Sequence, residues 1–244
     1  MTMLEAYISQ NAKLMGIGMS EAQARQFSAY HALLEQGNAR MNLTRVPLDD
    51  VREQSDRNYL DSIAPLTVAG LFADTQKIVD VGAGAGFPGI PLSIMLPQSE
   101  FVLLDALRKR VDFLSETIAA LGLRARAQHI RAEDAGHSKE LRAQFDVAVA
   151  RAVASLPVLL ELCMPLVKVG GHFIAYKGPS LDEEIAQSAH AILALGGAQP
   201  RVFPVTIPGR EEWSHRLCVI QKMSPTPKCY PRKASDIQKK PFIP

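Results

Sequence analysis

The sequence predicts an α/β fold in which an N-terminal helical region precedes a mostly parallel sheet with one antiparallel strand. Short apolar runs alternate with helix-length segments between residues 77 and 195, and a glycine-rich turn follows the first run. The alternation ends in two strand-like runs that no helix separates. Strands that alternate with helices form right-handed βαβ units, which build a parallel sheet with helices on both faces.

The first segment, residues 1–72, reads as helical because apolar residues recur at three- and four-residue spacings. Ser20 followed by Glu21 is a typical helix start. We therefore expect a helical region over 1–72, a main domain over 73–222 and a C-terminal tail over 223–244. The apolar residues of the helical pattern are Leu4, Ile8, Leu14, Phe27, Tyr30, Leu33 and Leu34.

Five strand candidates follow, each a short run with apolar character. They cover residues 77–82, 100–105, 127–132, 145–150 and 172–177. Helix-length segments lie between and after them, at 88–96, 108–121, 153–168 and 181–195.

The runs 201–207 and 216–222 are joined without a helix, which predicts a hairpin and hence an antiparallel strand. Pro204 lies inside the first run and predicts a sheet edge, because proline cannot donate to a neighbouring strand. The tail from Ser224 onward contains five prolines and is expected to be extended.

The glycine-rich turn reads Asp80-Val81-Gly82-Ala83-Gly84-Ala85-Gly86, and Gly84-x-Gly86-x-x-Gly89 matches the dinucleotide pattern. Such glycines let the chain turn tightly and let a ligand approach the backbone. Asp105 lies 21 residues after Gly84, a spacing that suits a ribose contact in a dinucleotide or an S-adenosylmethionine site. The pattern alone leaves open both ligands, and also a turn that binds neither.

Two features favour S-adenosylmethionine. The carboxylate of Asp80 beside the loop would repel a pyrophosphate, whereas a cofactor with a sulfonium and an ammonium group gains from it. The terminal hairpin is typical of Rossmann-like methyltransferases. An S-adenosylmethionine-dependent methyltransferase is therefore our first interpretation, and an NAD(P)-dependent oxidoreductase or a non-catalytic RNA-binding protein are the alternatives.

Residues at the ends of the other strands complete the expected site. Asp105 is expected to bind ribose hydroxyls, or to cap the following helix, or both. Ala132 and Glu133 follow the third strand, where an adenine-contacting segment would lie, and Arg151 ends the fourth strand at the rim where cofactor and substrate meet. Arg108–Arg110 are expected on a solvated helix face.

The net charge is only +2, from 27 Lys and Arg against 25 Asp and Glu, which excludes a uniformly basic nucleic-acid coat protein. The basic residues are uneven, because residues 222–244 hold six Lys and Arg against one Asp. In this tail Tyr230 could stack on a base while Lys228, Arg232 and Lys233 hold phosphates, unless the tail merely aids solubility. Lys177 ends the fifth strand and is a further candidate RNA contact.

The three cysteines, Cys163, Cys218 and Cys229, are widely spaced, and the six histidines form no cluster. We expect no disulfide framework and no metal site. The N-terminus lacks the apolar stretch of a signal peptide, and no 18-residue window has the apolar content of a membrane span. These features predict a cytoplasmic protein that does not enter a membrane.

A set of short motifs occurs in order along the chain. The motifs are NLT at 42–44, LDS at 60–62, DVGAGAGFPGIPL at 80–92, LLDALRKRVDFL at 103–114, RAE at 131–133, ARAVASL at 150–156, YKG at 176–178 and YPRK at 230–233. Together they resemble the bacterial 16S ribosomal RNA (guanine-N7) methyltransferase family, also called glucose-inhibited division protein B. The resemblance runs from about residue 33 to 241.

The resemblance implies transfer of a methyl group from S-adenosylmethionine to N7 of a guanine in 16S ribosomal RNA, free or in a small-subunit particle, with no obligatory protein partner. It implies cofactor contacts from Gly82, Phe87, Ala132, Glu133 and Arg151, together with Asp105 on the ribose. Guanine N7 carries a lone pair and no proton, so no catalytic acid or base is expected.

Two positions depart from the family pattern. Gly37 stands where the family commonly has Trp, and Asn58 stands where it often has His. Both are expected away from the cofactor site, so that they bear on RNA recognition.

Overall fold

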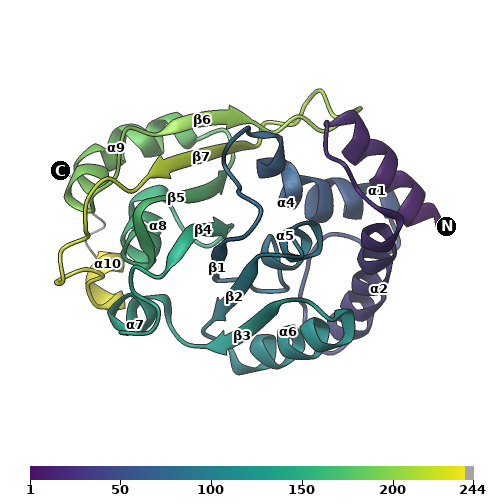
Figure 1. Cartoon of the computed structure of the whole chain (residues 1–244), viewed down its shortest axis with the longest axis horizontal. Helices are drawn as coiled ribbons and strands as arrows, with labels where there is room; N and C mark the ends of the chain where they lie inside the picture. The colour runs from purple at the N-terminus through teal and green to yellow at the C-terminus, as the bar shows by residue number, and fades with distance from the viewer. Residues whose placement is uncertain (240–244) are drawn as a thin grey trace.

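The computed structural model describes residues 1–239, which form a seven-stranded sheet in the order β3-β2-β1-β4-β5-β7-β6 (Figure 1). Strands β1 to β5 are parallel, and β7 is antiparallel to both β5 and β6. The strands are β1 Lys77–Val81, β2 Glu100–Asp105, β3 Ala125–His129, β4 Phe145–Arg151, β5 Val167–Lys177, β6 Arg201–Pro204 and β7 Arg216–Gln221. The predicted fold class is confirmed.

Helices cover both faces of the sheet (Figure 1). One face carries α1 Met3–Leu14, α2 Glu21–Asn38, α5 Gly89–Met95, α6 Arg108–Leu121 and the segment α3 Val51–Gln54, η1 Ser55–Leu60 (π-helical), α4 Asp61–Ile63 and η2 Ala64–Thr67 (3₁₀). The other carries α7 Ala132–His137, α8 Leu156–Cys163, η3 Met164–Leu166 (3₁₀), α9 Leu181–Ala194 and α10 Ala234–Lys239.

The central strands are apolar throughout because both of their faces are buried. In β1, Ile78 packs in the core under α1, α2, α5 and α6, whereas Val79 packs in the core under α8 and α9. Val147 and Ala148 of β4 divide between the two cores in the same way. This alternation produces three layers, with helices on either side of the sheet.

The N-terminal helices begin at capping boxes, where Thr2 pairs with Glu5 and Ser20 pairs with Gln23. The predicted helix start at Ser20 is thus confirmed. Phe27 and Tyr30 of α2 are fully buried in the same core as the sheet residues. The helical region therefore covers one face of the sheet.

The hairpin prediction is confirmed, since β6 and β7 pair antiparallel with Pro204 opposite Arg216. Pro204 lies in β6, the edge strand, as expected. The structure corrects five other elements. Strand β3 begins at Ala125 and β5 begins at Val167. Gly170, whose φ is +90°, lies inside β5 and interrupts its apolar run in the sequence.

Helix α8 is correspondingly shorter than the predicted segment 153–168. Helix α7, which covers only six residues, was too short for its periodicity to be detected. The tail is not wholly extended, because its residues 234–239 form α10, whose Ile237 is buried against the second core. Residues 240–244 of the predicted tail, Lys240 among them, lie outside the described residues.

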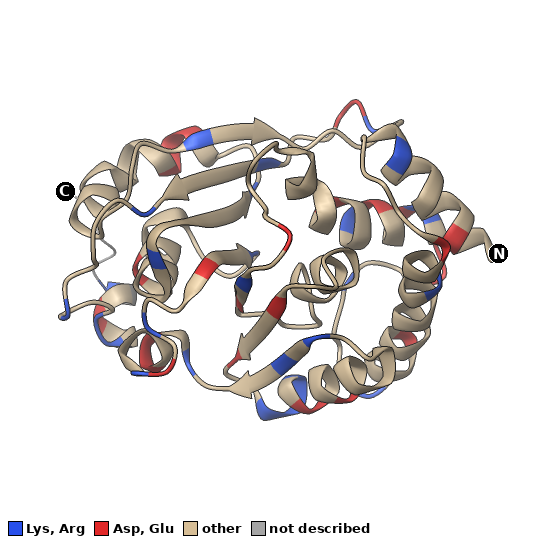
Figure 2. Ribbon diagram, in the orientation of Figure 1, with Lys and Arg blue, Asp and Glu red and all other residues tan. Residues whose placement is uncertain are grey.

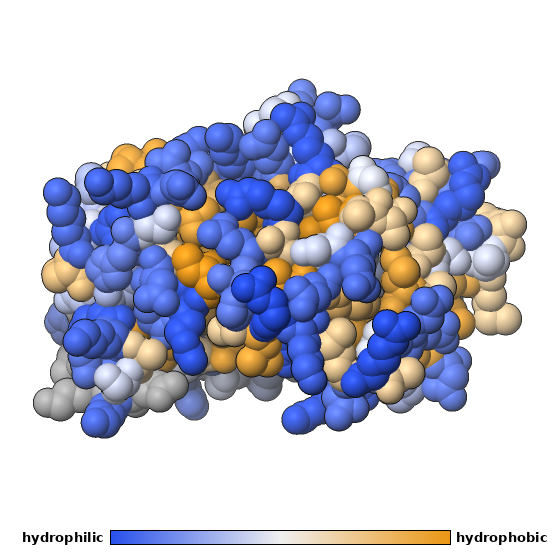
Figure 3. Space-filling view, turned by 90° about the horizontal axis from the view of Figure 1, so that it is seen from below, coloured by the Kyte–Doolittle hydropathy of each residue, from blue (hydrophilic) through white to orange (hydrophobic). Residues whose placement is uncertain are grey.

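The surface mixes both signs of charge, with Lys and Arg interspersed among Asp and Glu over most elements (Figure 2). Figure 3 shows one face as mainly hydrophilic, broken by small hydrophobic patches. Among residues 1–239 no helix has the length and apolar character needed to cross a bilayer. The same residues contain no cluster of His, Cys, Asp or Glu that could hold a metal ion.

Candidate functional site

The carboxyl ends of β1, β2 and β4 meet at one edge of the sheet, next to the point where the strand order reverses at β1. In open α/β sheets, ligands bind at this edge. The glycine loop after β1, Asp105 at the end of β2 and Arg151 at the end of β4 all lie there. The structure thus brings together three parts of the predicted site.

The glycine loop needs its glycines for two different reasons. Gly82, Gly84 and Gly86 have φ values of 76°, 59° and 107°, a region that side chains strongly disfavour. A Cβ on Gly86 would also lie 2.6 Å from Ile90 Cγ1 and 2.8 Å from the Tyr30 hydroxyl. The loop is therefore held in one conformation, partly by the N-terminal helix α2.

Asp80 lies fully buried beneath this loop. Its Oδ2 accepts a hydrogen bond from the Gly89 N–H at 2.8 Å, and a Cβ on Gly89 would meet that same oxygen at 2.7 Å. Burial raises the pKa of Asp80 to about 7, against the lowering effect of the Gly89 bond and of Arg151.

The second oxygen of Asp80, Oδ1, has no hydrogen-bond partner within residues 1–239. A buried, unpaired carboxylate oxygen favours a cationic neighbour and disfavours an anionic one. This local chemistry fits a positively charged cofactor such as S-adenosylmethionine better than a pyrophosphate.

Asp105 is 5% exposed and connects the loop to the start of α6. Its Oδ2 accepts from the Gly84 N–H at 2.9 Å, and its Oδ1 accepts from the Leu107 N–H at 2.8 Å. Arg110 lies 3.6 Å from Oδ2. This residue was expected on a solvated helix face, and it forms an ion pair with Asp105. Each carboxylate oxygen retains a lone pair that could accept from a ribose hydroxyl.

The segment after β3 runs beside Asp105, because the Ile130 N–H donates to the Asp105 carbonyl at 3.2 Å. Ala132 and Glu133, both half-buried, begin α7 immediately afterwards. These two residues therefore follow β3, the strand next to the one that ends at Asp105, where the sequence predicted an adenine contact.

Arg151 is the most connected side chain of the edge. Its guanidinium carbon lies 5.0 Å from the centroid of the Phe87 ring. It donates to Asp61 Oδ2 at 3.1 Å, to Asn58 Oδ1 at 3.2 Å and to the Arg57 carbonyl at 2.7 Å. Arg151 thereby joins the glycine loop to the helical segment 51–67.

The same network includes Asn58. We expected this residue away from the cofactor site; it lies in η1, and its amide oxygen accepts from Arg151, one of the residues predicted for that site. Its Nδ2 donates to Gln54 Oε1 at 3.0 Å, which fixes the amide orientation. No sequence pattern pointed to this contact, since Asn58 and Arg151 are far apart along the chain.

Gly37, the other departure from the family pattern, lies in a tightly packed environment. A Cβ there would lie 2.7 Å from atoms of both Leu43 and Phe113, so the chain has no room for a side chain at this position. The neighbouring Asn38 accepts hydrogen bonds from the Leu43 and Thr44 N–H groups, which forms the NLT turn. Gly37 thus serves the close packing of α2 against α6.

Beside Arg151 is a pocket of about 280 Å³ that the sequence did not predict. Lys177 lines it, with its Nζ donating to the Ala154 carbonyl at 2.8 Å and to Glu184 Oε2 at 2.6 Å. His215 also lines it, and its Nδ1 lies 2.9 Å from Asp61 Oδ1. The sequence indicated no cluster of histidines, and no spacing links His215 to Asp61.

The C-terminal tail packs on α7 and α8. The Arg232 guanidinium makes two hydrogen bonds to the fully buried Glu161, at 2.8 and 2.7 Å. Arg142 donates to the carbonyls of Thr226, Pro227 and Tyr230. Part of the tail's positive charge thus holds the tail itself.

The remaining tail cations differ in exposure. Lys222 is 2% exposed and donates to the Met164 carbonyl, and burial lowers its pKa to about 8. Lys228 and Lys233 are exposed, and Tyr230 is half-buried. The candidate RNA contacts of the tail are therefore not equivalent.

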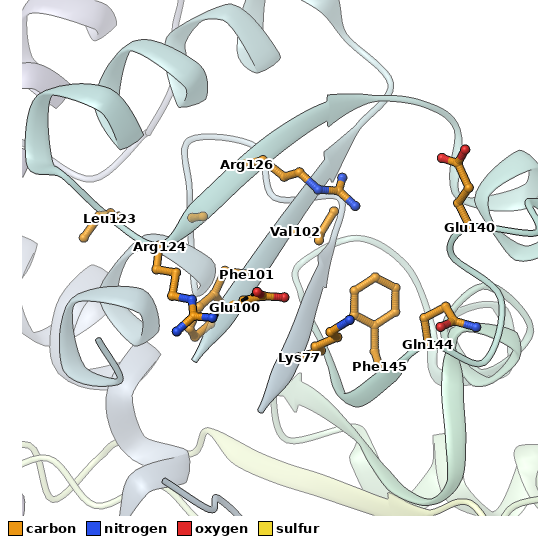
Figure 4. A pocket seen from close by; sticks show the side chains of 11 residues that line it. Lys77, Glu100, Phe101, Val102, Leu123, Arg124, Arg126, Glu140, Gln144 and Phe145 are labelled. Atoms are coloured by element: carbon orange, nitrogen blue, oxygen red, sulfur yellow. Dashed lines mark hydrogen bonds and ion pairs between the residues drawn. The ribbon is translucent and has the colours of Figure 1, made fainter. Parts of the chain in front are cut away.

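A larger hollow of about 400 Å³ lies at the opposite, amino end of β1 to β4. Its lining comes from these strands and the segments before them, with Arg124 against Glu100 at 3.1 Å (Figure 4). It contains none of the predicted site residues.

Comparison with known proteins supplies independent findings. The family model of rRNA small subunit methyltransferase G matches residues 23–211. Proteins named "Ribosomal RNA small subunit methyltransferase G" are 42% identical to this chain in Lactobacillus johnsonii, over 98% of this chain and 99% of theirs, and in Clostridium perfringens, over 93% and 94%.

A solved structure of TYW2 from M. jannaschii, in complex with AdoMet, resembles this chain with a TM-score of 0.53 and 14% identity. The match covers 76% of this chain and 80% of that one. At this identity the likeness concerns the fold alone, and it agrees with the sheet described above.

Proposed function

Because the chain belongs to the rRNA small subunit methyltransferase G family, we propose that it methylates N7 of a guanine in 16S ribosomal RNA. The family makes it an S-adenosylmethionine-dependent rRNA methyltransferase. The observation that most supports the use of this cofactor in the structure is the glycine loop over the buried, half-paired carboxylate of Asp80. The guanine, its N7 atom and the 16S molecule are the proposal.

The cofactor site we propose consists of residues from four strand ends. Asp105 would accept from the ribose hydroxyls, and Ala132 with Glu133 would contact the adenine. Arg151 and Phe87 would form the rim toward the substrate. At Gly82, Gly84 and Gly86 the main chain of the loop would lie close to the cofactor, because no side chain intervenes.

The proposed methyl transfer requires little proton transfer by the side chains of this protein. S-adenosylmethionine supplies a methyl group on a positively charged sulfur, which an in-plane lone pair can attack. Guanine N7 has such a lone pair and carries no proton, so we assign no catalytic acid or base. The side chains of the site have to align the acceptor and exclude water.

On the RNA side we propose Lys177, Lys228, Tyr230, Arg232 and Lys233. Lys228 and Lys233 are exposed and suited to phosphates, whereas Lys177 lines the pocket beside Arg151. The ion pair of Arg232 with Glu161 would hold the tail, with Tyr230, in place for such contacts.

We also propose that three segments of the chain have different roles. Residues 1–72 form the substrate side of the site, residues 73–222 hold the cofactor and residues 223–244 contact RNA. The substrate would be 16S RNA or a small-subunit particle in the cytoplasm, with no obligatory protein partner.

The test is transfer of a labelled methyl group from S-adenosylmethionine by the purified protein. Naked small-subunit rRNA and isolated small-subunit particles are separate arms, and large-subunit rRNA is the control. We expect label in small-subunit RNA in at least one arm. Label in neither arm, or equal label in large-subunit RNA, would refute the substrate proposal.

A further inference from the structure

The pocket beside Arg151 lies directly against the cofactor edge, because Arg151 both lines it and stacks on Phe87 of the glycine loop. Its charged lining residues are two acids and two cations, Asp61 and Glu184 with Arg151 and Lys177. Each acid is paired with one of the cations, at 3.1 Å and 2.6 Å. The pocket is therefore polar but close to neutral.

Most polar groups of this lining are already engaged. The Tyr176 hydroxyl donates to the Ser62 carbonyl at 2.6 Å, and Glu184 also accepts from Ser180 at 3.1 Å. His215 differs, because only its Nδ1 has a partner: within residues 1–239 its Nε2 makes no hydrogen bond. The side chain is 40% exposed, so a ligand in the pocket can reach it.

The tautomer of His215 follows from its partner. Asp61 is 1% exposed and paired with Arg151, so its carboxylate is an acceptor only. The Nδ1–H of His215 therefore donates to Asp61, and in the neutral form of the ring Nε2 is then an acceptor. Trp213 packs on the imidazole with ring centroids 4.6 Å apart and restricts its rotation.

We propose that this pocket receives the target guanine and that Nε2 of His215 accepts a hydrogen bond from the guanine N1–H. The inference rests on the proposed function. Adenine has no hydrogen at N1, so a fixed acceptor there distinguishes guanine from adenine. His215 is a residue that binds and positions the substrate, with no proton transferred.

The same hydrogen bond assists methyl transfer. As N7 gains the methyl group, the base becomes cationic and its N1–H becomes a stronger donor. An acceptor at N1–H is thus bound more tightly in the transition state than in the ground state, which raises the rate of the chemical step. The pairing of each lining cation with an acid also avoids placing an unpaired cation beside the developing charge.

The test compares the purified wild type with His215→Ala, His215→Gln and the control His190→Ala, which alters an exposed residue of α9. Single-turnover methylation is measured on small-subunit RNA carrying guanine, inosine or 2-aminopurine at the methylated position. Inosine keeps N1–H and lacks the 2-amino group, whereas 2-aminopurine lacks N1–H. Affinity for S-adenosylhomocysteine and the thermal midpoint report on folding.

We expect His215→Ala to slow transfer to guanine about tenfold, the effect of one hydrogen bond, with unchanged cofactor affinity. The wild type should methylate inosine nearly as fast as guanine and 2-aminopurine about tenfold more slowly, a preference that His215→Ala should lose. His215→Gln, which retains an acceptor oxygen, should lie between the two, and His190→Ala should match the wild type.

Wild-type rates in His215→Ala, or an undiminished preference for guanine over 2-aminopurine in that variant, would overturn the inference and leave the proposed function intact. If the wild type itself places no methyl group on guanine N7, the proposed function fails instead.

Discussion

Arg151 and Asp61 form an ion pair of 3.1 Å that joins the end of β4 to the helical segment over 51–67. Asp61 is 1% exposed, so its negative charge depends on Arg151 for compensation, and His215 adds a hydrogen bond to it. The same guanidinium stacks on Phe87, in the glycine loop. A single side chain thus links the helical region, the glycine loop and the pocket.

The first prediction concerns this link. Arg151→Lys keeps the charge but loses the fork of donors that reaches Asp61, Asn58 and the Arg57 carbonyl together. We expect the free energy of unfolding to fall by about 1–3 kcal/mol. Urea denaturation measures it, with Arg25→Lys on the exposed surface of α2 as the control. Equal losses in both variants would contradict the network.

The second prediction concerns Asp105. Asp105→Ala removes the acceptor for Gly84 and for the proposed ribose contact, so cofactor binding should weaken by roughly 1.5–3 kcal/mol. Calorimetric titration with S-adenosylhomocysteine measures this loss, and Asp112→Ala on the exposed face of α6 serves as control. Unchanged affinity would mean that Asp105 accepts only from the Gly84 and Leu107 N–H groups and does not bind the cofactor.

The third prediction concerns pH. Asp80 has a pKa of about 7 when folded, against an ordinary value of 3.8, so the folded protein binds a proton that the unfolded chain has lost. Its ionisation therefore costs nothing below about pH 4 and destabilises the fold progressively between pH 4 and 7, by about 4 kcal/mol in total.

Asp80→Asn removes this dependence, since the amide does not titrate. We expect the wild type to lose stability relative to Asp80→Asn as the pH rises from 4 to 7, in denaturant titrations without cofactor. A constant difference between the two proteins over that interval would show that Asp80 is already ionised in the fold.

The fourth prediction separates the tail cations. Lys228→Gln combined with Lys233→Gln removes two exposed charges, so the slope of log affinity for RNA against log salt should decrease by up to about 2. Filter binding over a salt series measures the slope, with Lys13→Gln on α1 as control and cofactor affinity unchanged. A slope equal to that of the control variant would mean that these lysines aid solubility and do not contact RNA phosphates.

The sequence predicted most of the fold because its signals are local. The alternation of apolar runs, the glycines after β1 and the missing helix between β6 and β7 are each visible within a few residues. The capping box at Ser20 is of the same kind. The loop residues and Asp105 could be proposed as site residues because strand ends in a parallel sheet meet at one edge.

The features that could not be predicted are mostly contacts between residues far apart in the sequence. Nothing near Asn58 indicates that it contacts Arg151, and nothing near His215 indicates that Asp61 sets its tautomer. Arg232 was predicted only as a phosphate contact, because Glu161, its partner, lies in a different part of the chain. Helix α7 was missed because two turns give too little periodicity.

The central claim is tested most directly by locating the methyl group. RNA methylated by the purified protein is digested and mapped by mass, and reduction with borohydride followed by aniline cleaves the chain at 7-methylguanosine. We predict one labelled guanine in 16S RNA with cleavage at that position, absent when Asp105→Ala replaces the wild type at limiting cofactor. Label on another atom or another base, without cleavage, would contradict guanine N7 as the acceptor.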